Sequence, residues 1–267
     1  MTGEAKHPAI RVDDIDRTFH PGTVQETRAL RGISFDLQHG EFAVIIGSNG
    51  AGKSTLLNAL AGEVSIDSGR ISVNGAEIQN WPVYRRAGLM SRVFQDPMRG
   101  TASTLTIEEN LSIAMRRGQR RGLRLSIHKA DRDLFRDRLQ LLGLGLENRL
   151  SDRVDLLSGG QRQSLTLVMA TLKQPQLLLL DEHTAALDPR AAALVMQTTS
   201  DVVQKNSTTT LMVTHNMSHA IEFGNRLLMI HEGSVILDVG AEEKSRLTAA
   251  SLVDRFHDVV SDRMVLS

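Results

Sequence analysis

The sequence predicts an α/β domain built around a wound, mainly parallel sheet, and three short apolar segments carry this prediction. Phe42–Ile46, Leu177–Leu180 and Leu211–Thr214 have the length and composition of strands that are buried on both faces. Each segment is followed at once by a polar or glycine-rich turn, and helical patterns alternate with the strands. Because ligands bind at the carboxyl ends of strands in open α/β sheets, we expect the three turns to converge on one site.

Length and composition exclude several classes of protein. A chain of 267 residues can bury a core without disulfides or a structural metal, and it contains no cysteine. Lys+Arg and Asp+Glu both number 31, so the net charge of zero gives no general attraction to nucleic acid or anionic lipid. The first sixteen residues lack the apolar core of a signal peptide, and no apolar run is long enough to span a bilayer. We therefore expect other chains to supply the membrane part of any membrane process.

Other segments predict the elements around this core. Alternating apolar residues in Ile10–Phe19, Ile33–Leu37 and Ile71–Val73 are typical of antiparallel strands. Leu227–Val239 predicts a hairpin that turns at Glu232-Gly233.

Residues 96–160 predict a mostly helical insertion in the α/β core. Thr106 and Glu109 form a capping box, and apolar residues follow it at helical spacing. A second helical face runs from Leu134 to Leu142 and ends at Gly143. Between the two helices lies the basic segment Arg116–Arg124, which is either a solvated loop or a patch for lipid or a partner.

A glycine-rich motif directly follows the first apolar strand. Residues 47–54 read GSNGAGKS, which fits the P-loop motif G-x-x-x-x-G-K-[ST], and helical sequence follows it. The glycines let backbone N–H groups turn toward phosphate oxygens, and the helix start adds positive charge. The Lys53 side chain can reach the β- and γ-phosphates, and the Ser54 hydroxyl can bind Mg²⁺. The alternative is a glycine-rich turn without a ligand. The residues expected at the nucleotide are Ser48, Asn49, Gly50, Ala51, Gly52, Lys53, Ser54 and Thr55.

Two acidic residues follow the second apolar strand. Asp181, at the end of a buried strand downstream of a P-loop, is typical of the Walker B carboxylate that holds Mg²⁺. Glu182 is placed to polarise the attacking water as a general base. The alternative is that both residues only mark the end of a strand.

Residues 157–161 read LSGGQ and stand at the start of a predicted helix that Pro175 closes. Ser158 and the following glycines therefore lie where hydroxyl and N–H groups can bind an anion. A serine N-cap before a glycine turn would explain this geometry alone. It does not explain the combination: LSGGQ shortly before a Walker B strand and after a P-loop resembles the ABC ATPase family. The resemblance covers nearly the whole chain and implies nucleotide contacts from Ser158, Gly159, Gly160 and Gln161.

The resemblance assigns roles to four further residues. Gln95 matches the Q-loop glutamine, which contacts Mg²⁺ and senses the γ-phosphate, and His215 matches the switch histidine at that phosphate. Asp188 lies in the matching D-loop, and it is also a good N-cap before Pro189. Phe19 lies where the family carries an aromatic residue that stacks on adenine, although an insertion follows it here and a role in the core is the alternative. Gln95 could equally be a surface residue.

The resemblance also implies the fold and the domain organisation. We expect one ABC ATPase domain over residues 1–267: a P-loop NTPase (RecA-like) core with an antiparallel β subdomain. Core and β subdomain would occupy residues 1–95 and 161–245, an inserted helical subdomain 96–160, and a short helical tail 246–267.

The implied function is ATP binding and hydrolysis, with Mg²⁺, by a head-to-tail homodimer around two ATP. The dimer would drive transport, import being expected, through separate permease subunits at the cytoplasmic face of a bacterial membrane. A solute-binding protein would act indirectly, and no nucleic-acid partner is expected. Three alternatives stay open: an exporter or lipoprotein-release ATPase, a soluble ABC ATPase without a permease, and an ATP-binding regulator without catalysis.

One position departs from the family pattern. The family usually has proline after the Walker B Asp-Glu, and this chain has His183. The stretch DEHTAALDP over residues 181–189 resembles a subgroup of importer ATPases, some of which are linked to aromatic amino acid or phosphonate uptake. The transported substrate stays open.

Overall fold

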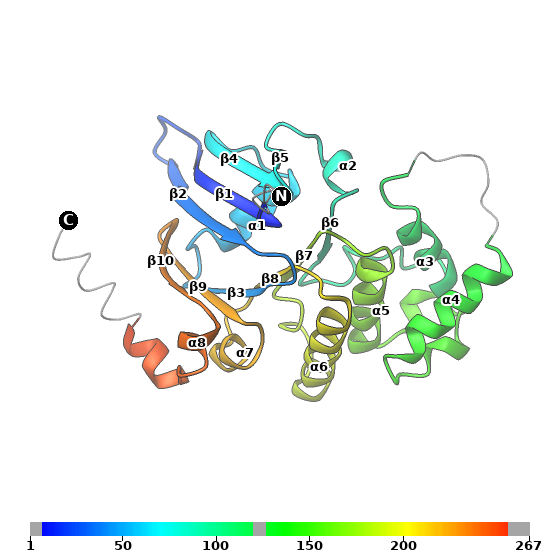
Figure 1. Cartoon of the computed structure of the whole chain (residues 1–267). Helices are drawn as coiled ribbons and strands as arrows, with labels where there is room; N and C mark the ends of the chain where they lie inside the picture. Colours follow the sequence, from blue (N-terminus) through cyan, green and yellow to red (C-terminus); the bar gives the residue numbers. More distant parts are fainter. Residues whose placement is uncertain (1–6, 120–126, 256–267) are drawn as a thin grey trace, which may run out of the picture. The chain divides into compact units, whose positions relative to one another are not determined.

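The computed structural model describes residues 7–119 and 127–255, and it divides the chain into two compact units (Figure 1). The first unit combines residues 1–80 with residues 209–267, and the second unit is Trp81–Thr208. Both units contain strands and helices of their own.

An antiparallel sheet forms one part of the first unit. Its order is β2-β1-β4-β5, with β1 Ile10–Phe19, β2 Thr27–Leu37, β4 Ser68–Val73 and β5 Ala76–Glu77. Ile10 and Val12 are buried on β1 while Arg11 between them is exposed, because successive side chains of a strand point to opposite faces. Ile15, three residues after Val12, is also buried, because the pairing register with β2 shifts between them, where Asp14 has φ at 49°. The predicted antiparallel strands are confirmed.

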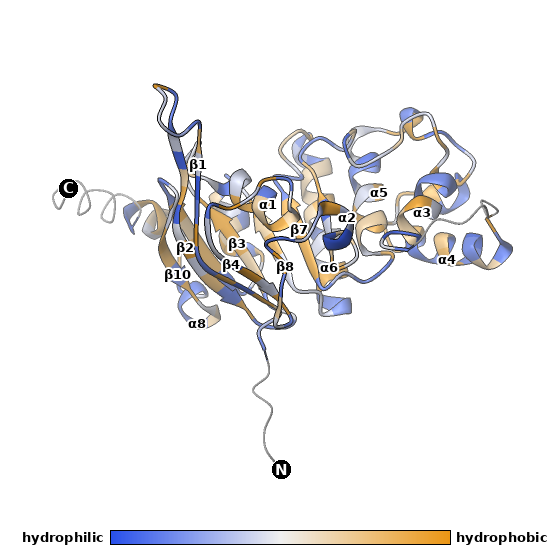
Figure 2. Ribbon diagram, turned by 90° about the horizontal axis from the view of Figure 1, so that it is seen from above, coloured by the Kyte–Doolittle hydropathy of each residue, from blue (hydrophilic) through white to orange (hydrophobic). Residues whose placement is uncertain are grey.

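A parallel arrangement forms the other part of the first unit. Strand β3 (Phe42–Ile46) pairs in parallel with β8 (Thr210–Val213) and with β9 (Arg226–His231), and β10 (Ser234–Val239) pairs antiparallel with β9. All five residues of β3 are buried, and Figure 2 shows its apolar character. The predicted hairpin is confirmed, and its turn has positive φ at Glu232 and Gly233. The helices of this unit are α1 Lys53–Ala61, α7 Met217–Glu222 and α8 Ala241–Lys244.

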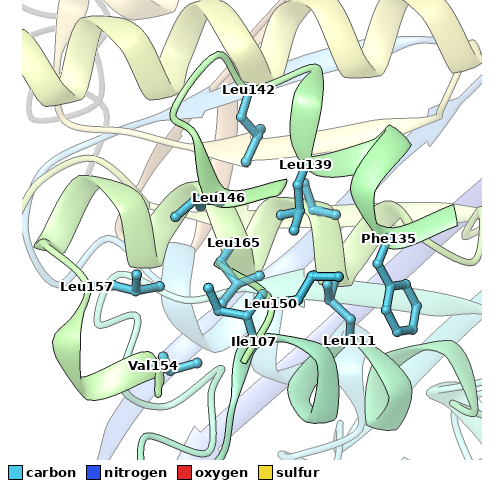
Figure 3. Packing of buried hydrophobic residues seen from close by; sticks show 11 residues of the cluster. Ile107, Leu111, Phe135, Leu139, Leu142, Leu146, Leu150, Val154, Leu157 and Leu165 are labelled. Carbon is cyan, nitrogen blue, oxygen red and sulfur yellow. The ribbon is translucent and has the colours of Figure 1, made fainter. Parts of the chain in front are cut away.

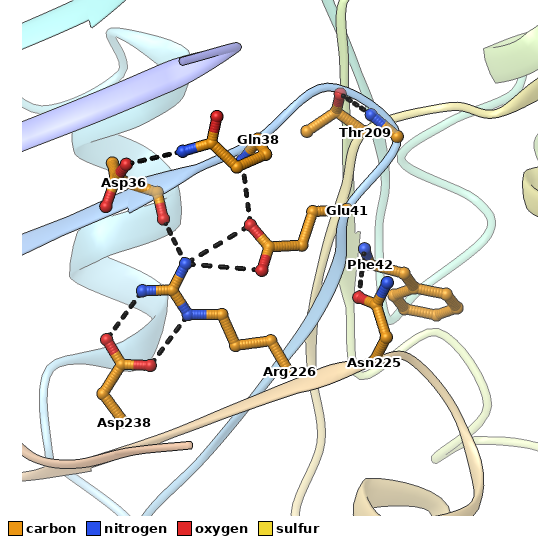
Figure 4. Close-up of polar contacts among 9 residues, drawn as sticks. Asp36, Gln38, Glu41, Phe42, Thr209, Asn225, Arg226 and Asp238 are labelled. Carbon is orange, nitrogen blue, oxygen red and sulfur yellow. Dashed lines mark hydrogen bonds and ion pairs between the residues drawn. The ribbon is translucent and has the colours of Figure 1, made fainter. Parts of the chain in front are cut away.

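Arg226 ties several strands of the first unit together (Figure 4). Its guanidinium donates two hydrogen bonds to the Asp238 carboxylate on β10, at 2.8 and 2.7 Å, and one to the Asp36 carbonyl on β2, at 2.6 Å. Glu41, just before β3, lies 3.3 Å from the same guanidinium. The pKa of Arg226 is raised, mainly by the hydrogen bonds to Asp238.

The second unit holds the parallel strand pair β6 (Met90–Val93) and β7 (Leu177–Asp181). Its helices are α2 Val83–Arg86, α3 Ile107–Met115, α4 Lys129–Gln140, α5 Gly159–Thr171 and α6 Pro189–Asn206, with short 3-10 turns η1 Leu146–Asn148 and η2 Val154–Leu156. The predicted capping box is confirmed, because the Thr106 hydroxyl accepts from the Glu109 N–H and the Glu109 carboxylate accepts from the Thr106 N–H.

An apolar cluster packs α3, α4 and α5 against one another (Figure 3). Ile107 and Leu111 of α3 lie in one cluster with Phe135 and Leu139 of α4, which confirms both predicted helices. The second helix is shorter than predicted, because α4 ends at Gln140 and Leu141 is exposed. Of the basic segment 116–124, residues 120–124 lie outside the described residues. Arg117, within the described part, is half-buried and donates to the Ala170 and Lys173 carbonyls at the end of α5. This arginine therefore has a structural role that the sequence did not indicate.

Candidate functional site

The P-loop follows β3, and at two of its positions the surrounding backbone leaves room only for glycine. A Cβ atom on Gly47 would lie 2.1 Å from the Ile230 carbonyl oxygen. At Gly52, where φ is 101°, a Cβ atom would lie 2.3 Å from the Ala29 carbonyl oxygen. Both contacts are far shorter than van der Waals distance, so any other residue would displace the loop.

Neighbouring segments of the first unit hold the loop from outside. The Gly233 N–H in the β9–β10 turn donates to the Ala51 carbonyl at 3.0 Å, and the Arg31 N–H of β2 donates to the Gly233 carbonyl at 2.8 Å. The hairpin turn thus connects the P-loop to the antiparallel sheet. Sequence reasoning placed this turn correctly but had no signal for its contact with the loop.

Lys53 and Ser54 begin helix α1 and point to different surroundings. Lys53 is 6% exposed, and its ammonium group donates to the Gly47 and Ser48 carbonyls of the loop at 2.8 and 2.9 Å. Ser54 is exposed, as are Ser48, Asn49 and Gly50 at the tip of the loop. A buried cation beneath an exposed, glycine-rich helix start is an arrangement suited to phosphate.

His215 lies at the same edge of the sheet as the P-loop. It lies two residues beyond β8, which pairs in parallel with β3, and the Thr214 N–H donates to the Ile45 carbonyl at 3.1 Å. The His215 side chain is exposed. Its neighbour His219 on α7 has a lowered pKa, chiefly because burial disfavours its charged form. The first unit therefore brings together two predicted phosphate contacts, the P-loop and His215.

Phe19 ends β1, opposite Thr27 on β2. The Arg17 guanidinium lies 4.9 Å from the centre of its ring, and Arg17 also pairs with Asp67 at 2.8 Å. The ring is partly buried. Its predicted stacking on adenine stays a prediction.

In the second unit, Asp181 ends β7 and is paired with a basic residue. The Arg92 guanidinium on β6 donates to Oδ2 of Asp181 at 2.6 Å. The next residue, Glu182, has φ at 43°, a left-handed conformation that is unfavourable for a side chain of this kind. Its carbonyl accepts from the Ala185 N–H at 2.9 Å in the turn that follows. No pattern in the sequence indicated the Arg92 pair.

Residues 157–161 (LSGGQ), called the signature from here on, lie at the start of helix α5, as expected. The Ser158 hydroxyl caps the helix by accepting from the Gln161 N–H at 3.3 Å, and the Gln161 side chain accepts from the Ser158 N–H at 3.1 Å. Ser158 and Gly159 are exposed. Asp188 likewise caps α6, accepting from the Arg190 and Ala191 N–H groups at 3.1 and 3.0 Å, which confirms its predicted capping role.

Gln95 is exposed and lies two residues beyond β6. A second glutamine, Gln163 of α5, is fully buried and donates to the Phe94 carbonyl at 3.0 Å. This bond connects the signature helix to the residue before Gln95. Its partners are far apart in sequence, so sequence reasoning missed Gln163.

The oxygen donors expected to hold a metal are a hydroxyl (Ser54), an amide (Gln95) and a carboxylate (Asp181). Within the described part of the chain, no three His, Cys, Asp or Glu side chains gather into a metal site of their own. Mg²⁺ commonly binds one or two carboxylates together with substrate phosphates and water, all hard oxygen ligands. The donor set therefore fits Mg²⁺ in company with a nucleotide.

Comparison with known proteins decides the family. Residues 30–185 match the ABC transporter family. Over 251 residues the chain is 41% identical to the tyrosine transport ATP-binding protein of Clostridioides difficile, a match that covers 94% of this chain and 100% of that protein. This chain belongs to the ABC transporter family. It is an ATP-binding, ATP-hydrolysing subunit.

Further relatives of this ABC subunit agree with the assignment. The phosphonates import ATP-binding protein PhnC of Frankia casuarinae is 30% identical over 249 residues, covering 92% of this chain and 96% of that protein. In the described ranges 7–119 and 127–255, every helix is too short or too polar to cross a bilayer.

Solved ABC cassettes have the same fold. A dimeric cassette in a post-hydrolysis state, bound to ADP and Pi, has a TM-score of 0.74 at 24% identity, covering 87% of this chain and 98% of that one. The protein cbiO1 from Clostridium perfringens, part of an ABC transporter complex, also has a TM-score of 0.74, at 25% identity, covering 88% and 90%. The predicted fold class, a P-loop NTPase of mixed α/β structure, is confirmed.

Proposed function

We propose that this ABC subunit works as a head-to-tail homodimer that encloses two ATP and drives solute import through separate permease subunits. The observation that carries the proposal is the presence of two separate helix starts suited to an anion in one chain. Helix α1 begins at the P-loop in the first unit, and α5 begins at the signature in the second. Ser54 is exposed at the first start and Ser158 at the second, so two copies arranged oppositely would cover both sides of each ATP.

Within each ATP site, we assign the following roles. Lys53 and the P-loop N–H groups bind the β- and γ-phosphates, while Gln95 and His215 contact the γ-phosphate. Glu182 orients the attacking water and accepts its proton. Ser158 and Gly160 of the partner copy complete the phosphate shell, and Phe19 stacks on adenine. Mg²⁺, held by Ser54, Gln95 and Asp181, would neutralise phosphate charge in the transition state.

The direction of transport rests on the relatives. The tyrosine and phosphonate proteins are named as transport and import subunits, and both match over more than nine-tenths of their length. We infer import of a small polar solute, delivered by a solute-binding protein, with this subunit at the cytoplasmic face of the membrane. An exporter ATPase is the alternative. Reading frames for a permease and a solute-binding protein beside this gene would favour import.

The substitution Glu182→Gln tests the catalytic role. The amide keeps the size of the side chain but removes its basicity, so ATP binding should persist while turnover falls by about a thousandfold or more. Because hydrolysis would no longer open the dimer, the variant should elute as a dimer with Mg²⁺ and ATP in size-exclusion chromatography. Glu242→Gln, on exposed α8, is the matched control. Rapid turnover by Glu182→Gln would refute the assignment of the base.

A further inference from the structure

Arg92 and Asp181 form a nearly buried ion pair between the two strands of the second unit. The side chains are 8% and 15% exposed, and the N–O distance is 2.6 Å. In the parallel register Arg92 lies opposite Leu179, two residues before Asp181. Residues two apart point to the same face of a strand, so the guanidinium and the carboxylate share one face of the pair.

The Arg92 side chain is also held by an aromatic ring. Its guanidinium carbon lies 4.8 Å from the centre of the Phe94 ring, and Arg99 lies 4.9 Å from the same ring. Phe94 directly precedes Gln95, the second residue to which we assign metal binding. Arg92 therefore contacts the Walker B carboxylate and the residue next to the Q-loop glutamine.

We propose that Arg92 is an internal cation that competes with Mg²⁺ for the Asp181 carboxylate, so that metal binding must break or weaken the Arg92–Asp181 pair. This inference rests on the proposed assignment of Asp181 to the metal. Two effects act in the same direction. The pair uses one carboxylate oxygen, and it places a positive charge beside a site for a dication, where repulsion is strong because solvent screening is low.

The competition couples metal loading to the position of Arg92. With the pair formed, the carboxylate is neutralised within the protein, and the unit tolerates a nearly buried acid. Mg²⁺ alone would not displace the guanidinium from Asp181. Mg²⁺ together with a correctly placed nucleotide would displace it. Arg92 thus raises the threshold for metal binding without touching the reacting atoms, which makes it a positioning residue.

The test measures how strongly Mg²⁺ tightens nucleotide binding. The affinity of the protein for a fluorescent ATP analogue is determined in Mg²⁺ and in EDTA. The dissociation constant in EDTA divided by that in Mg²⁺ gives the coupling between metal and nucleotide. Replacing Arg92 with glutamine removes the charge and should raise this ratio about tenfold, a typical coupling between two ligands. In EDTA the variant should also unfold at a lower temperature than wild type, because Asp181 loses its partner.

Control variants separate this effect from general damage. Arg132→Gln breaks the Arg132–Glu108 pair of the same unit, at 2.7 Å, and should leave the ratio unchanged. In an Asp181→Asn background, Arg92→Gln should raise the ratio by a clearly smaller factor, because only the charge repulsion is then left to remove. If Arg92→Gln does not fold, Arg92→Lys serves instead; it loses the planar fork and should raise the ratio by a smaller factor.

An unchanged or lowered ratio in the Arg92 variants would overturn the inference, since it would mean that Arg92 is neutral toward the metal or helps to bind it. A rise that is equally large without the Asp181 carboxylate would overturn it as well, since competition for that carboxylate would then contribute nothing. Wild-type protein whose nucleotide affinity is indifferent to Mg²⁺ would instead contradict the proposed function.

Discussion

At the residue scale, His183 shows how a departure from the family pattern is accommodated. The side chain is 2% exposed, and Nε2 lies 3.1 Å from the Thr199 hydroxyl of α6. The hydroxyl donates its single proton to the Val195 carbonyl at 2.7 Å, so it must accept from His183. Nε2 therefore carries a proton. This bond anchors His183, which directly follows Glu182. The strained backbone is that of Glu182, with its positive φ.

The Thr199–His183 bond leads to a stability prediction. Thr199→Val keeps the shape of the side chain but deprives the buried His183 N–H of this acceptor. The free energy of unfolding, measured in urea, should fall by about 1–3 kcal/mol. Thr198→Val is a matched control, because Thr198 makes the same bond to a helix carbonyl, that of Leu194, at 2.8 Å. Equal losses in both variants would contradict a specific role for the bond to His183.

The sequence singled out His183 but could not find its partner. A histidine at a position where the family has proline is visible in the sequence, whereas Thr199 cannot be told from any other threonine on the helix. The same holds for Arg92, whose partner Asp181 is known only because the structure pairs β6 with β7. Buried polar pairs join residues far apart in sequence, and no local pattern records them.

At the element scale, sequence patterns predicted the contacts that form between residues close together in the chain. The caps at Thr106, Ser158 and Asp188 bind N–H groups two or three residues away, and all three were predicted. The contacts of Arg226 are the opposite case. They join β9 to β10 and to the end of β2, across as many as 190 residues.

Arg226→Met should destabilise the strands of the first unit. The side chain is only 14% exposed, so methionine would fill the space while leaving the Asp36 carbonyl and the acids without their donor. We expect the free energy of unfolding to fall by about 3 kcal/mol. Arg246→Met breaks an exposed pair with Glu242 and should change it by less than about 0.5 kcal/mol. Chemical denaturation of both variants decides, and similar small losses would show that the network contributes little.

At the scale of the whole molecule, the central proposal is that each ATP site needs two copies of the chain. Lys53→Ala removes the ammonium group that we assign to the phosphates, and Ser158→Arg blocks the signature helix start. Each variant alone should be inactive. In a mixed dimer one site would carry both substitutions and the other neither. After equal amounts are mixed, about half of the dimers should be mixed, so about a quarter of all ATP sites should be intact.

The measurement is ATP hydrolysis before and after mixing of the two purified variants. Two preparations of the same variant, mixed in the same way, provide the control. A mixture as inactive as its components would contradict the opposed arrangement of the two copies. Activity in the Ser158→Arg variant alone would show that a single chain completes its own site.

The sequence by itself determined the family, the fold class and the strand and helix types, and it predicted the nucleotide residues. These depend on short motifs, on apolar periodicity and on capping, all of which are written within a few residues. The predicted subdomain boundaries and the nucleotide contacts stay predictions. Only the tertiary structure decided how the P-loop is held by Gly233, how Asp181 is paired with Arg92 and how His183 is bonded to Thr199. The physical reason is that these contacts arise from packing between distant segments, where burial forces each polar group to find a partner.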